Sequence, residues 1–465
     1  MVTKIQSLLK QPEGKTLEFK RDLSSRRNIL RTLVAFANSA GGKLIIGVED
    51  RTQKPVGVSD PLDQEERLCS MIADSIEPRL VPNIELVSLK DKTLLLVEVF
   101  LSNSRPHRIR TEGEAGVYVR LGSTNRQADP DLINEIKRSV DGIVFDELPN
   151  SQLSSNDIDL DAINSIFERK RRFSNQQLQT LKLLVEDQGR LVPTNGSLLL
   201  FGKDREQHFP DAWVQCGRFK GKTKADMLDH IEIHDHLPWA VEKMMAFLQK
   251  HAMRRSDFSE LKRKDIWNIP ITILREAIIN AVVHADYSQK GAPVRLAFYD
   301  DRIEIDNPGL LLPGLTVDDL KQGVSKIRNR VIARVFRELE LIEQWGSGLP
   351  RIFSEAKKLG LPIPEIQEIG MQVRFTVFHG ASDIEDKVTS ELGNKLGNRL
   401  GNKLGKTKEK ILTQMKTNPK ISATQLAKII EISMTAVEKN IKQLREDGMI
   451  KRVGGTRGHW EVIDE

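Results

Sequence analysis

Three carboxylates surround a predicted β-α-β unit near the start of the chain. Glu13 and Glu18 precede the helix of this unit, and Asp50 follows its second strand. Converging carboxylates either bind a divalent cation or repel one another, and a bound cation would polarise a phosphodiester. Lys20 would help to neutralise the phosphate. The alternative is that these residues are solvated surface acids, which is the commoner fate of Asp and Glu.

The local sequence predicts how these side chains are positioned. Residues 16–20 read TLEFK and alternate apolar with polar residues, so a strand there places Glu18 and Lys20 on one face. A helix follows and ends at a glycine pair. Residues 43–48 are then a buried strand, and pairing of the two strands would bring Asp50 toward the other two carboxylates.

Five segments within residues 1–130 carry a family resemblance: PEGKTLEFKRD, VAFANSAGGKLIIGVED, KPVGV, RPHRIR and GVYVRLGSTNRQA. They resemble the AlbA-like core of the Schlafen family. The resemblance implies a nuclease that cuts structured RNA such as tRNA with Mg²⁺ or Mn²⁺. Glu13, Glu18 and Asp50 would form its catalytic metal site, and Lys20 is a catalytic candidate beside them because of its place on the same strand face.

Two points of this resemblance stay open. Glu49 stands beside Asp50 and is an alternative third carboxylate. Many bacterial relatives keep the carboxylates and are described only as nucleic-acid-binding domains, so the motif favours binding over cleavage. Arg105 and Arg120, in the last two segments, are candidate nucleic-acid contacts.

A second candidate site lies on a predicted helix at residues 275–287, REAIINAVVHADY. Glu276 and Asn280 are four residues apart and share one face. Glu276 could activate a water for attack on a γ-phosphate, while the Asn280 oxygen binds the Mg²⁺ that bridges the phosphates. His284 is expected to be a structural hydrogen-bonding group. Because Glu-xxx-Asn occurs by chance about once in such a chain, the context has to decide.

The first part of that context is a strand expected at residues 294–309. It ends in Asp306 and a turn at Gly309, which suits adenine recognition. GSLLLFGK and AWVQCGRFKG, earlier in the same region, are also expected to be strands.

The second part is a pair of helix starts. SKIRNRVIARVF places Arg328 and Asn329 at the beginning of one helix, and EQWGSGLPRI places Gly346 and Gly348 before another. Glycine backbone at such a point can approach phosphates closely.

Together these segments resemble the ATP-binding domain of gyrase B subunits, MutL and histidine kinases, the GHKL type. The form is the divergent one labelled as the C-terminal part of RecG-like proteins, over about residues 190–380. The resemblance implies ATP and Mg²⁺ as cofactors, Glu276 as the base, Asn280 as the magnesium ligand and Asp306 as the adenine contact. Gly346 and Gly348 would form the phosphate lid.

The chain departs from this family in one motif, and it also lacks a motif that helicases have. Asp-x-Gly-x-Gly is replaced by Asp306-Asn307-Pro308-Gly309, with proline where the first glycine belongs. No GxxxxGK[ST] motif is present, so helicase activity is not expected. Loss of hydrolysis, leaving a scaffold, is a further possibility.

The C-terminal segment, residues 406–465, predicts a winged helix-turn-helix with two strands around GGTRG. Residues 406–460 hold 12 Lys or Arg against 5 Asp or Glu, which favours nucleic acid as the partner over protein. The third helix and the wing supply the candidate contacts, which are Thr435, Lys439, Lys442, Lys451, Arg452 and Arg457.

Composition sets the broad class. The chain has 465 residues, 39% hydrophobic and 29% charged, which fits several α/β (α+β) domains. Its two cysteines are far apart, so neither a disulfide framework nor a zinc site is expected. No signal peptide or membrane span is predicted, and we expect a cytoplasmic homo-oligomer.

The expected domains are a Schlafen-like domain at 1–140, a linker at 141–155, and a connector with the GHKL-like domain at 156–380. An LGNK-repeat tether at 381–405 and the winged helix at 406–465 follow. The sequence therefore predicts an ATP-binding nucleic-acid effector with a candidate nuclease module. The alternative is an ATP-responsive, DNA-binding transcription regulator without nuclease activity.

Overall fold

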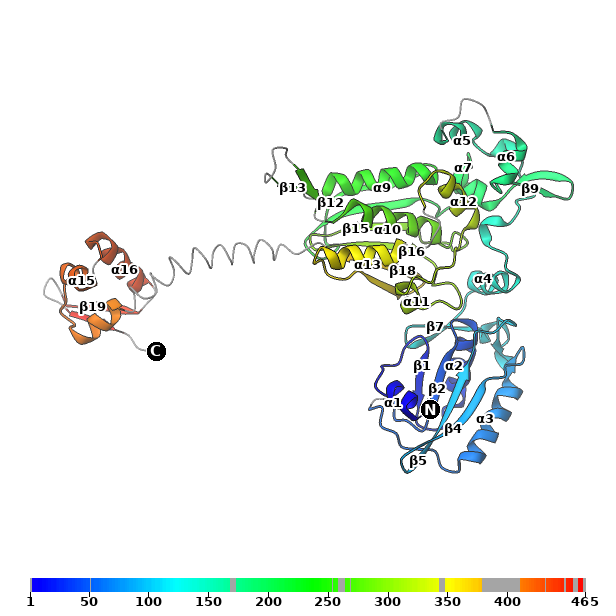
Figure 1. The fold of residues 1–465 in the computed structure, drawn as a ribbon, viewed down its shortest axis with the longest axis horizontal. Coiled ribbons are helices and arrows are strands. Elements are labelled where there is room, and N and C mark those ends of the chain that lie inside the picture. Colours follow the sequence, from blue (N-terminus) through cyan, green and yellow to red (C-terminus); the bar gives the residue numbers. More distant parts are fainter. Residues whose placement is uncertain are drawn as a thin grey trace. The chain divides into compact units, whose positions relative to one another are not determined.

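The computed structural model divides the chain into two compact units, Met1–His379 and Gly380–Glu465, and each is described by itself. Figure 1 labels many of their elements. The structure describes residues 2–50, 52–167, 173–252, 254–257, 264–267, 269–342, 348–378, 410–430, 432–446, 449–454 and 459–462. The LGNK repeat, Gly346 and Arg457 lie outside these ranges. No helix in the described ranges is long and apolar enough to cross a membrane.

The first unit begins with a four-stranded sheet of order β1-β2-β5-β4. β1 and β2 are parallel, with Glu18 opposite Leu44, so the expected β-α-β unit is confirmed. Leu33 and Phe36 of helix α2 pack on one face of the sheet, and Phe19 lies in the core on the other. The elements of this part are α1 (Val2–Leu8), β1 (Leu17–Lys20), α2 (Arg26–Asn38), β2 (Gly42–Ile46), α3 (Pro61–Ser75), β3 (Ile76–Glu77), β4 (Asn83–Leu89), β5 (Lys92–Val99), β6 (Arg108–Ile109), η1 (Arg110–Gly116), β7 (Tyr118–Leu121), β8 (Thr124–Gln127) and α4 (Pro130–Asp141).

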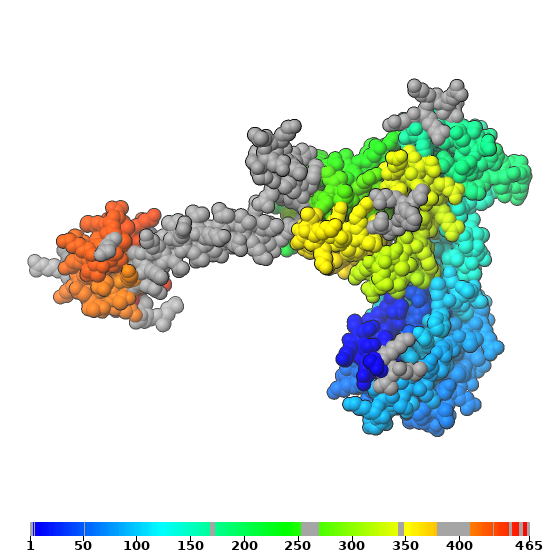
Figure 2. Space-filling view, in the orientation of Figure 1, coloured from blue at the N-terminus to red at the C-terminus, as the bar shows by residue number. Residues whose placement is uncertain are grey.

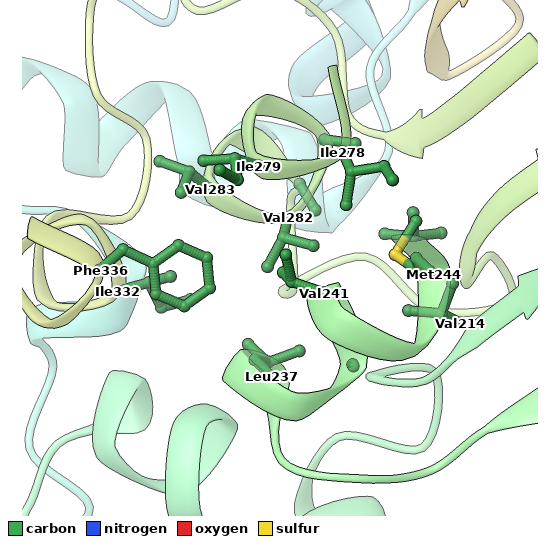
Figure 3. Packing of buried hydrophobic residues seen from close by; sticks show 14 of the residues in the cluster. Val214, Leu237, Val241, Met244, Ile278, Ile279, Val282, Val283, Ile332 and Phe336 are labelled. Atoms are coloured by element: carbon green, nitrogen blue, oxygen red, sulfur yellow. The ribbon is translucent and has the colours of Figure 1, made fainter. Parts of the chain in front are cut away.

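The second part of this unit contains a six-stranded sheet of order β12-β11-β15-β16-β18-β17. Its core is apolar: Figure 3 shows Ile278 and Val282 of helix α10 facing Val241 of α9, with Phe336 of α12 beside them. The elements are α9 (Leu237–His251), β13 (Arg254–Asp257), β14 (Lys264–Trp267), α10 (Ile271–His284), β15 (Val294–Phe298), β16 (Arg302–Pro308), α11 (Val317–Lys321), α12 (Arg330–Glu338), α13 (Gly348–Lys358), β17 (Glu365–Ile369) and β18 (Gln372–Phe378). Figure 2 shows the segment with α11 and α13 on the surface of the unit.

A connector joins these two parts, and it includes residues 141–155, the expected linker. Asp146 is buried and its carboxylate accepts hydrogen bonds from the backbone N–H groups of Arg330, Val331 and Ile332 at the start of α12. The connector's elements are η2 (Phe145–Glu147), η3 (Ser155–Asp157), α5 (Leu160–Ile166), α6 (Asn175–Thr180), β9 (Leu184–Asp187), β10 (Arg190–Pro193), α7 (Asn195–Phe201) and α8 (Arg205–His208), after which β11 (Val214–Lys220) and β12 (Asp226–Ile233) begin the large sheet.

Two expected strands are wrong. The first six residues of GSLLLFGK belong to helix α7, which Thr194 caps by accepting from the Ser197 N–H. These six residues are all buried, so periodicity could not distinguish helix from strand. The single strand expected at 294–309 is a hairpin, in which the Tyr299 N–H donates to the Arg302 carbonyl.

The second unit folds as the expected winged helix. A helix at 410–417 precedes α15 (Ala423–Ile430) and α16 (Met434–Glu446), and β19 (Ile450–Val453) pairs with β20 (His459–Val462). Ile411, Leu426, Val437 and Trp460 are in its small core. Ser422 and Gln425 form a reciprocal cap before α15.

Candidate functional site

The N-terminal carboxylates come together around Lys20. The Lys20 Nζ lies 2.6 Å from Glu18 Oε1 and 3.6 Å from Asp50 Oδ2. Glu13 Oε1 accepts a hydrogen bond of 2.8 Å from the Phe19 N–H, so the loop before β1 folds back onto the strand. Burial raises the pKa of Glu13, the Phe19 N–H opposes that rise, and the negative charges of Glu18 and Asp50 add to it.

Glu18 is already neutralised by the protein. Its second carboxylate oxygen bonds the guanidinium of Arg120, which is 1% exposed and also bonds Asn125 and the Gly14 carbonyl. Arg120 therefore lies in the interior and cannot reach a nucleic acid, which corrects the expectation for this residue. Among the described residues, no group of three or more His, Cys, Asp or Glu is arranged to hold a metal ion.

Asp50 differs from Glu18 in exposure. Its side chain is 53% exposed, whereas the Glu18 side chain is 9% exposed. Glu49, the alternative third carboxylate, bonds the Thr52 hydroxyl at 2.6 Å and lies 3.8 Å from Arg21. Glu49 therefore points to its own turn, and Asp50 is the acid that approaches Lys20.

A cavity of about 220 Å³, the first cavity, contains the second candidate site. Glu276 and Asn280 line it from α10, and the Asn280 side-chain N–H donates to Glu276 at 3.0 Å. Arg351 of α13 lies 3.3 Å from the other Glu276 oxygen. Gly348 lies against Glu276 so closely that a Cβ there would stand 1.7 Å from its Oε1. The expected association of Glu276, Asn280 and Gly348 in one place is thus present.

The walls of the first cavity have two characters. Leucines 310, 311, 312, 315 and 320 supply an apolar wall, and Lys326, Arg337 and Arg351 bring positive charge. An apolar wall suits a nucleobase, and cations suit phosphates. The residues present therefore fit ATP, with the Asn280 oxygen as the atom available to Mg²⁺.

Asp306 does not line this cavity. It lies on the other face of the sheet, where Arg374 of β18 holds its two oxygens at 2.7 and 2.9 Å. Its neighbour Asn307 lines the cavity instead, because successive strand residues point to opposite faces. The structure therefore corrects the expected placement of Asp306 at the ATP site, and Asn307 is the neighbouring residue that lines the cavity.

The remaining residues expected at the ATP site have structural roles. Asn329 is buried and its amide donates to the carbonyls of Val283 and Ala285. Arg328 lines the first cavity, but its guanidinium bonds Glu135 and the Leu310 carbonyl.

Gly309 is needed for its backbone. It has a φ of +100°, and a Cβ there would meet the Asp286 side chain at 2.7 Å. A left-handed conformation and this close approach both favour glycine. Its turn starts the segment of leucines that lines the first cavity.

The winged helix presents the expected cationic face. Thr435, Lys439 and Lys442 are exposed on α16, and Lys451 and Arg452 are exposed on β19. Arg452 stacks 4.9 Å above the Trp460 ring, which holds it on the wing. Arg105, the other predicted contact, is instead half-buried in the first unit.

Comparisons with known families agree with these modules. Residues 13–129 match the family model described as "Schlafen, AlbA_2", and residues 291–377 match "Putative ATP-dependent DNA helicase recG C-terminal". Residues 404–451 match "Winged helix-turn-helix DNA-binding". The chain has the three-part architecture that its motifs predict. It is a nucleic-acid-binding, ATP-associated protein by these domains, although Glu276 and Asn280 precede the second match.

Solved structures give weaker likenesses. The DIP2311 protein from Corynebacterium diphtheriae is 18% identical, with 99% of this chain and 96% of that chain covered and a TM-score of 0.43. The "N-terminal Domain of Putative ATP-dependent DNA Helicase RecG-related Protein from Nitrosomonas europaea" is 26% identical, with 28% of this chain and 90% of that chain covered and a TM-score of 0.22. Comparison with curated proteins gave no match.

Proposed function

We propose that the chain is an ATP-responsive regulator that binds nucleic acid through its terminal modules without cutting it. The observation that carries this proposal is the pairing of Glu18 with both Arg120 and Lys20. A divalent cation at Glu18 would have to displace Lys20 and disturb a buried ion pair, and disturbing such a pair is costly. Positive charge at Lys20 can serve a phosphate directly.

Contacts between the first cavity and the N-terminal module support a response to ATP. The Gly314 N–H donates to the Ser39 carbonyl at 2.7 Å, and Gly314 follows the leucines that line the cavity. The Leu311 N–H donates to Glu368, which also binds Lys15, in the loop before β1. A nucleotide that moves the cavity wall would therefore move groups bonded to the N-terminal module.

Nucleic-acid binding is tested by fluorescence anisotropy of the full chain with labelled duplex DNA and with tRNA. Binding should persist in EDTA, because no step of it needs a metal. A Lys439→Gln/Lys442→Gln variant should weaken duplex binding and reduce the salt slope by roughly 1 for each lost phosphate contact. Lys357→Gln/Lys358→Gln, an equal change of charge on exposed residues of α13, is the matched control. Binding that vanishes in EDTA would contradict the proposal.

ATP binding and hydrolysis are tested separately. Isothermal titration with ATP and Mg²⁺ measures binding, and phosphate release measures turnover. Glu276→Ala should abolish turnover and spare binding, because Glu276 would act on the attacking water. Wild-type binding without turnover would leave ATP as a conformational ligand on a scaffold. Lack of any binding would remove the ATP-responsive part of the proposal.

A second candidate function is a metal-dependent nuclease on structured RNA, with Glu13, Glu18 and Asp50 as ligands of Mg²⁺ or Mn²⁺. One observation favours it: the charges of Glu18 and Asp50 both raise the pKa of Glu13, so the three acids are within electrostatic reach. Incubation of tRNA with either metal should then give cleavage that Glu18→Ala abolishes. Uncut RNA in both samples would eliminate this candidate.

Size-exclusion chromatography with light scattering would test the expected homo-oligomer.

A further inference from the structure

A second and larger cavity, of about 600 Å³, lies between α4 and α12 within the first unit. Residues 325–328 line both cavities and form the wall between them. Arg138, Arg330 and Arg334 line the second cavity but not the first. The second cavity therefore has binding groups of its own.

The charge of this cavity is strongly unbalanced. Six arginines and one lysine line it against two carboxylates, Glu135 and Asp286. Both carboxylates are engaged by one arginine: Arg328 bonds Glu135, and its Nη1 lies 3.5 Å from Asp286. Arg138 also interacts electrostatically with Glu135, and Arg330 lies 3.4 Å from Glu147. Arg105, Lys326, Arg334 and Arg337 form no ion pair within the described ranges, so their positive charge is left for a ligand.

Arg105 has donor capacity that the described part of the chain does not use. Its Nη1 bonds the Ser102 carbonyl and its Nη2 lies 3.1 Å from the Ser139 hydroxyl. Its Nε is buried and has no hydrogen-bond acceptor within the described part of the chain. Burial lowers the pKa of Arg105, and no charged neighbour opposes that effect. An anion that accepts from the buried Nε would stabilise this half-buried guanidinium.

Two further arginines contact neutral oxygens or a ring, although Arg138 also interacts electrostatically with Glu135. The Arg138 Nη2 lies 3.3 Å from the Ser288 hydroxyl, and its guanidinium is 5.4 Å from the Phe145 ring. The Arg334 Nη1 lies 3.3 Å from the Thr180 carbonyl. These contacts orient the guanidinium groups without neutralising them, which is the state a phosphate-binding site needs.

We propose that the second cavity binds the polyphosphate group of a nucleotide, at a place distinct from the ATP site of the first cavity. Guanidinium groups match phosphate oxygens in pairs, and a multiply charged phosphate chain can engage several of them. A free nucleotide and the 5′-triphosphate end of an RNA share this chemistry. The inference goes beyond the proposed function, and only the coupling between the two cavities rests on ATP binding in the first.

Residues 325–328 separate the two cavities, so a ligand in one cavity can affect binding in the other. A phosphate ligand in the second cavity that contacts Arg328 or Lys326 would touch the same segment that ATP would contact in the first cavity. The affinities of the two sites are therefore coupled, and the coupling is reciprocal.

The test is hydrogen-exchange mass spectrometry on the full chain with inorganic tripolyphosphate, a 5′-triphosphorylated RNA oligonucleotide and its 5′-hydroxyl counterpart. The variant is Arg138→Gln/Arg334→Gln, and the matched control is Arg67→Gln/Arg190→Gln, two exposed arginines outside both cavities. Tripolyphosphate should protect α4 and α12 in wild type and control. In the variant its affinity should fall by about tenfold or more, since hydrogen bonds to charged groups are lost.

The oligonucleotides identify the source of the phosphates. Protection by the triphosphorylated RNA and not by the 5′-hydroxyl RNA would assign the site to an RNA end, and protection by tripolyphosphate alone would assign it to a free nucleotide. Both results support the proposal. Equal affinity in variant and wild type, or no protection of α4 and α12, would overturn it. If the double variant unfolds at a lower temperature, Arg334→Gln alone replaces it.

Discussion

Lys15 and Glu368 are 353 residues apart in the sequence, yet the Lys15 Nζ lies 2.7 Å from both carboxylate oxygens of Glu368. Their side chains are 13% and 6% exposed. Lys15 precedes β1 of the N-terminal module, and Glu368 is on β17 of the large sheet. This ion pair therefore joins the module that holds Glu18 to the one that holds the first cavity.

Removing one partner of this pair should be strongly destabilising. Lys15→Ala would leave the Glu368 carboxylate buried, with the Leu311 N–H as its remaining hydrogen-bond donor among the described residues, and breaking a buried pair costs roughly 3–5 kcal/mol. Urea unfolding of the full chain measures the change in the free energy of unfolding. Arg67→Ala is the control, because its exposed pair with Asp63 should contribute about 0.5 kcal/mol or less. Similar losses of unfolding free energy in both variants would contradict the stabilising role of the Lys15–Glu368 pair.

Gly348→Ala should act on turnover through Glu276. The new Cβ would lie 1.7 Å from Glu276 Oε1 and 2.4 Å from its Cδ, so the carboxylate has to move. We expect phosphate release to fall to about the level of Glu276→Ala, while ATP binding changes by less than about 1 kcal/mol. Gly14→Ala, where a Cβ meets nothing within 4 Å, is the control. Unchanged turnover would mean that Glu276 does not act from this position.

Substitutions at Asp306 and Asn307 should have different effects, the first on stability and the second on nucleotide binding. Asp306→Ala breaks the pair with Arg374, so it should lower the melting temperature and leave the affinity for ATP nearly unchanged. Asn307→Ala removes a polar group of the cavity wall and should weaken ATP binding by about tenfold. Thermal unfolding and isothermal titration measure the two effects. The reverse pattern would restore Asp306 as the adenine contact.

Local patterns in the sequence were sufficient to predict several structural features. Alternation in residues 16–20 predicted Glu18 and Lys20 side by side, and helical spacing predicted that Glu276 and Asn280 share a face. Capping residues and apolar spacing predicted the winged helix. In each case the contacts are close in sequence, where periodicity fixes direction.

The residues that sequence reasoning missed depend on register or on distant contacts. Overlooking the turn between β15 and β16 left the strand register undefined, and a shift of one residue moves a side chain to the other face. Asp306 and Asn307 differ by that single step. The pairs Arg120–Glu18 and Lys15–Glu368 join distant segments, and no local spacing signals them. The arginines of the second cavity are likewise gathered only by folding.

The stability of the chain should fall in mild acid because of His284. Burial, with the positive charge of Arg328 adding to it, lowers the pKa of His284 to about 4, against about 6.5 in an unfolded chain. Between these values the unfolded state binds more protons, so the free energy of unfolding rises with pH and decreases by roughly 2–3 kcal/mol on acidification from 6.5 to 4. His284→Gln should flatten this part of the urea-measured pH profile, whereas His230→Gln, at an exposed position, should leave it unchanged. A profile that is equally steep in both variants would show that other groups cause the loss.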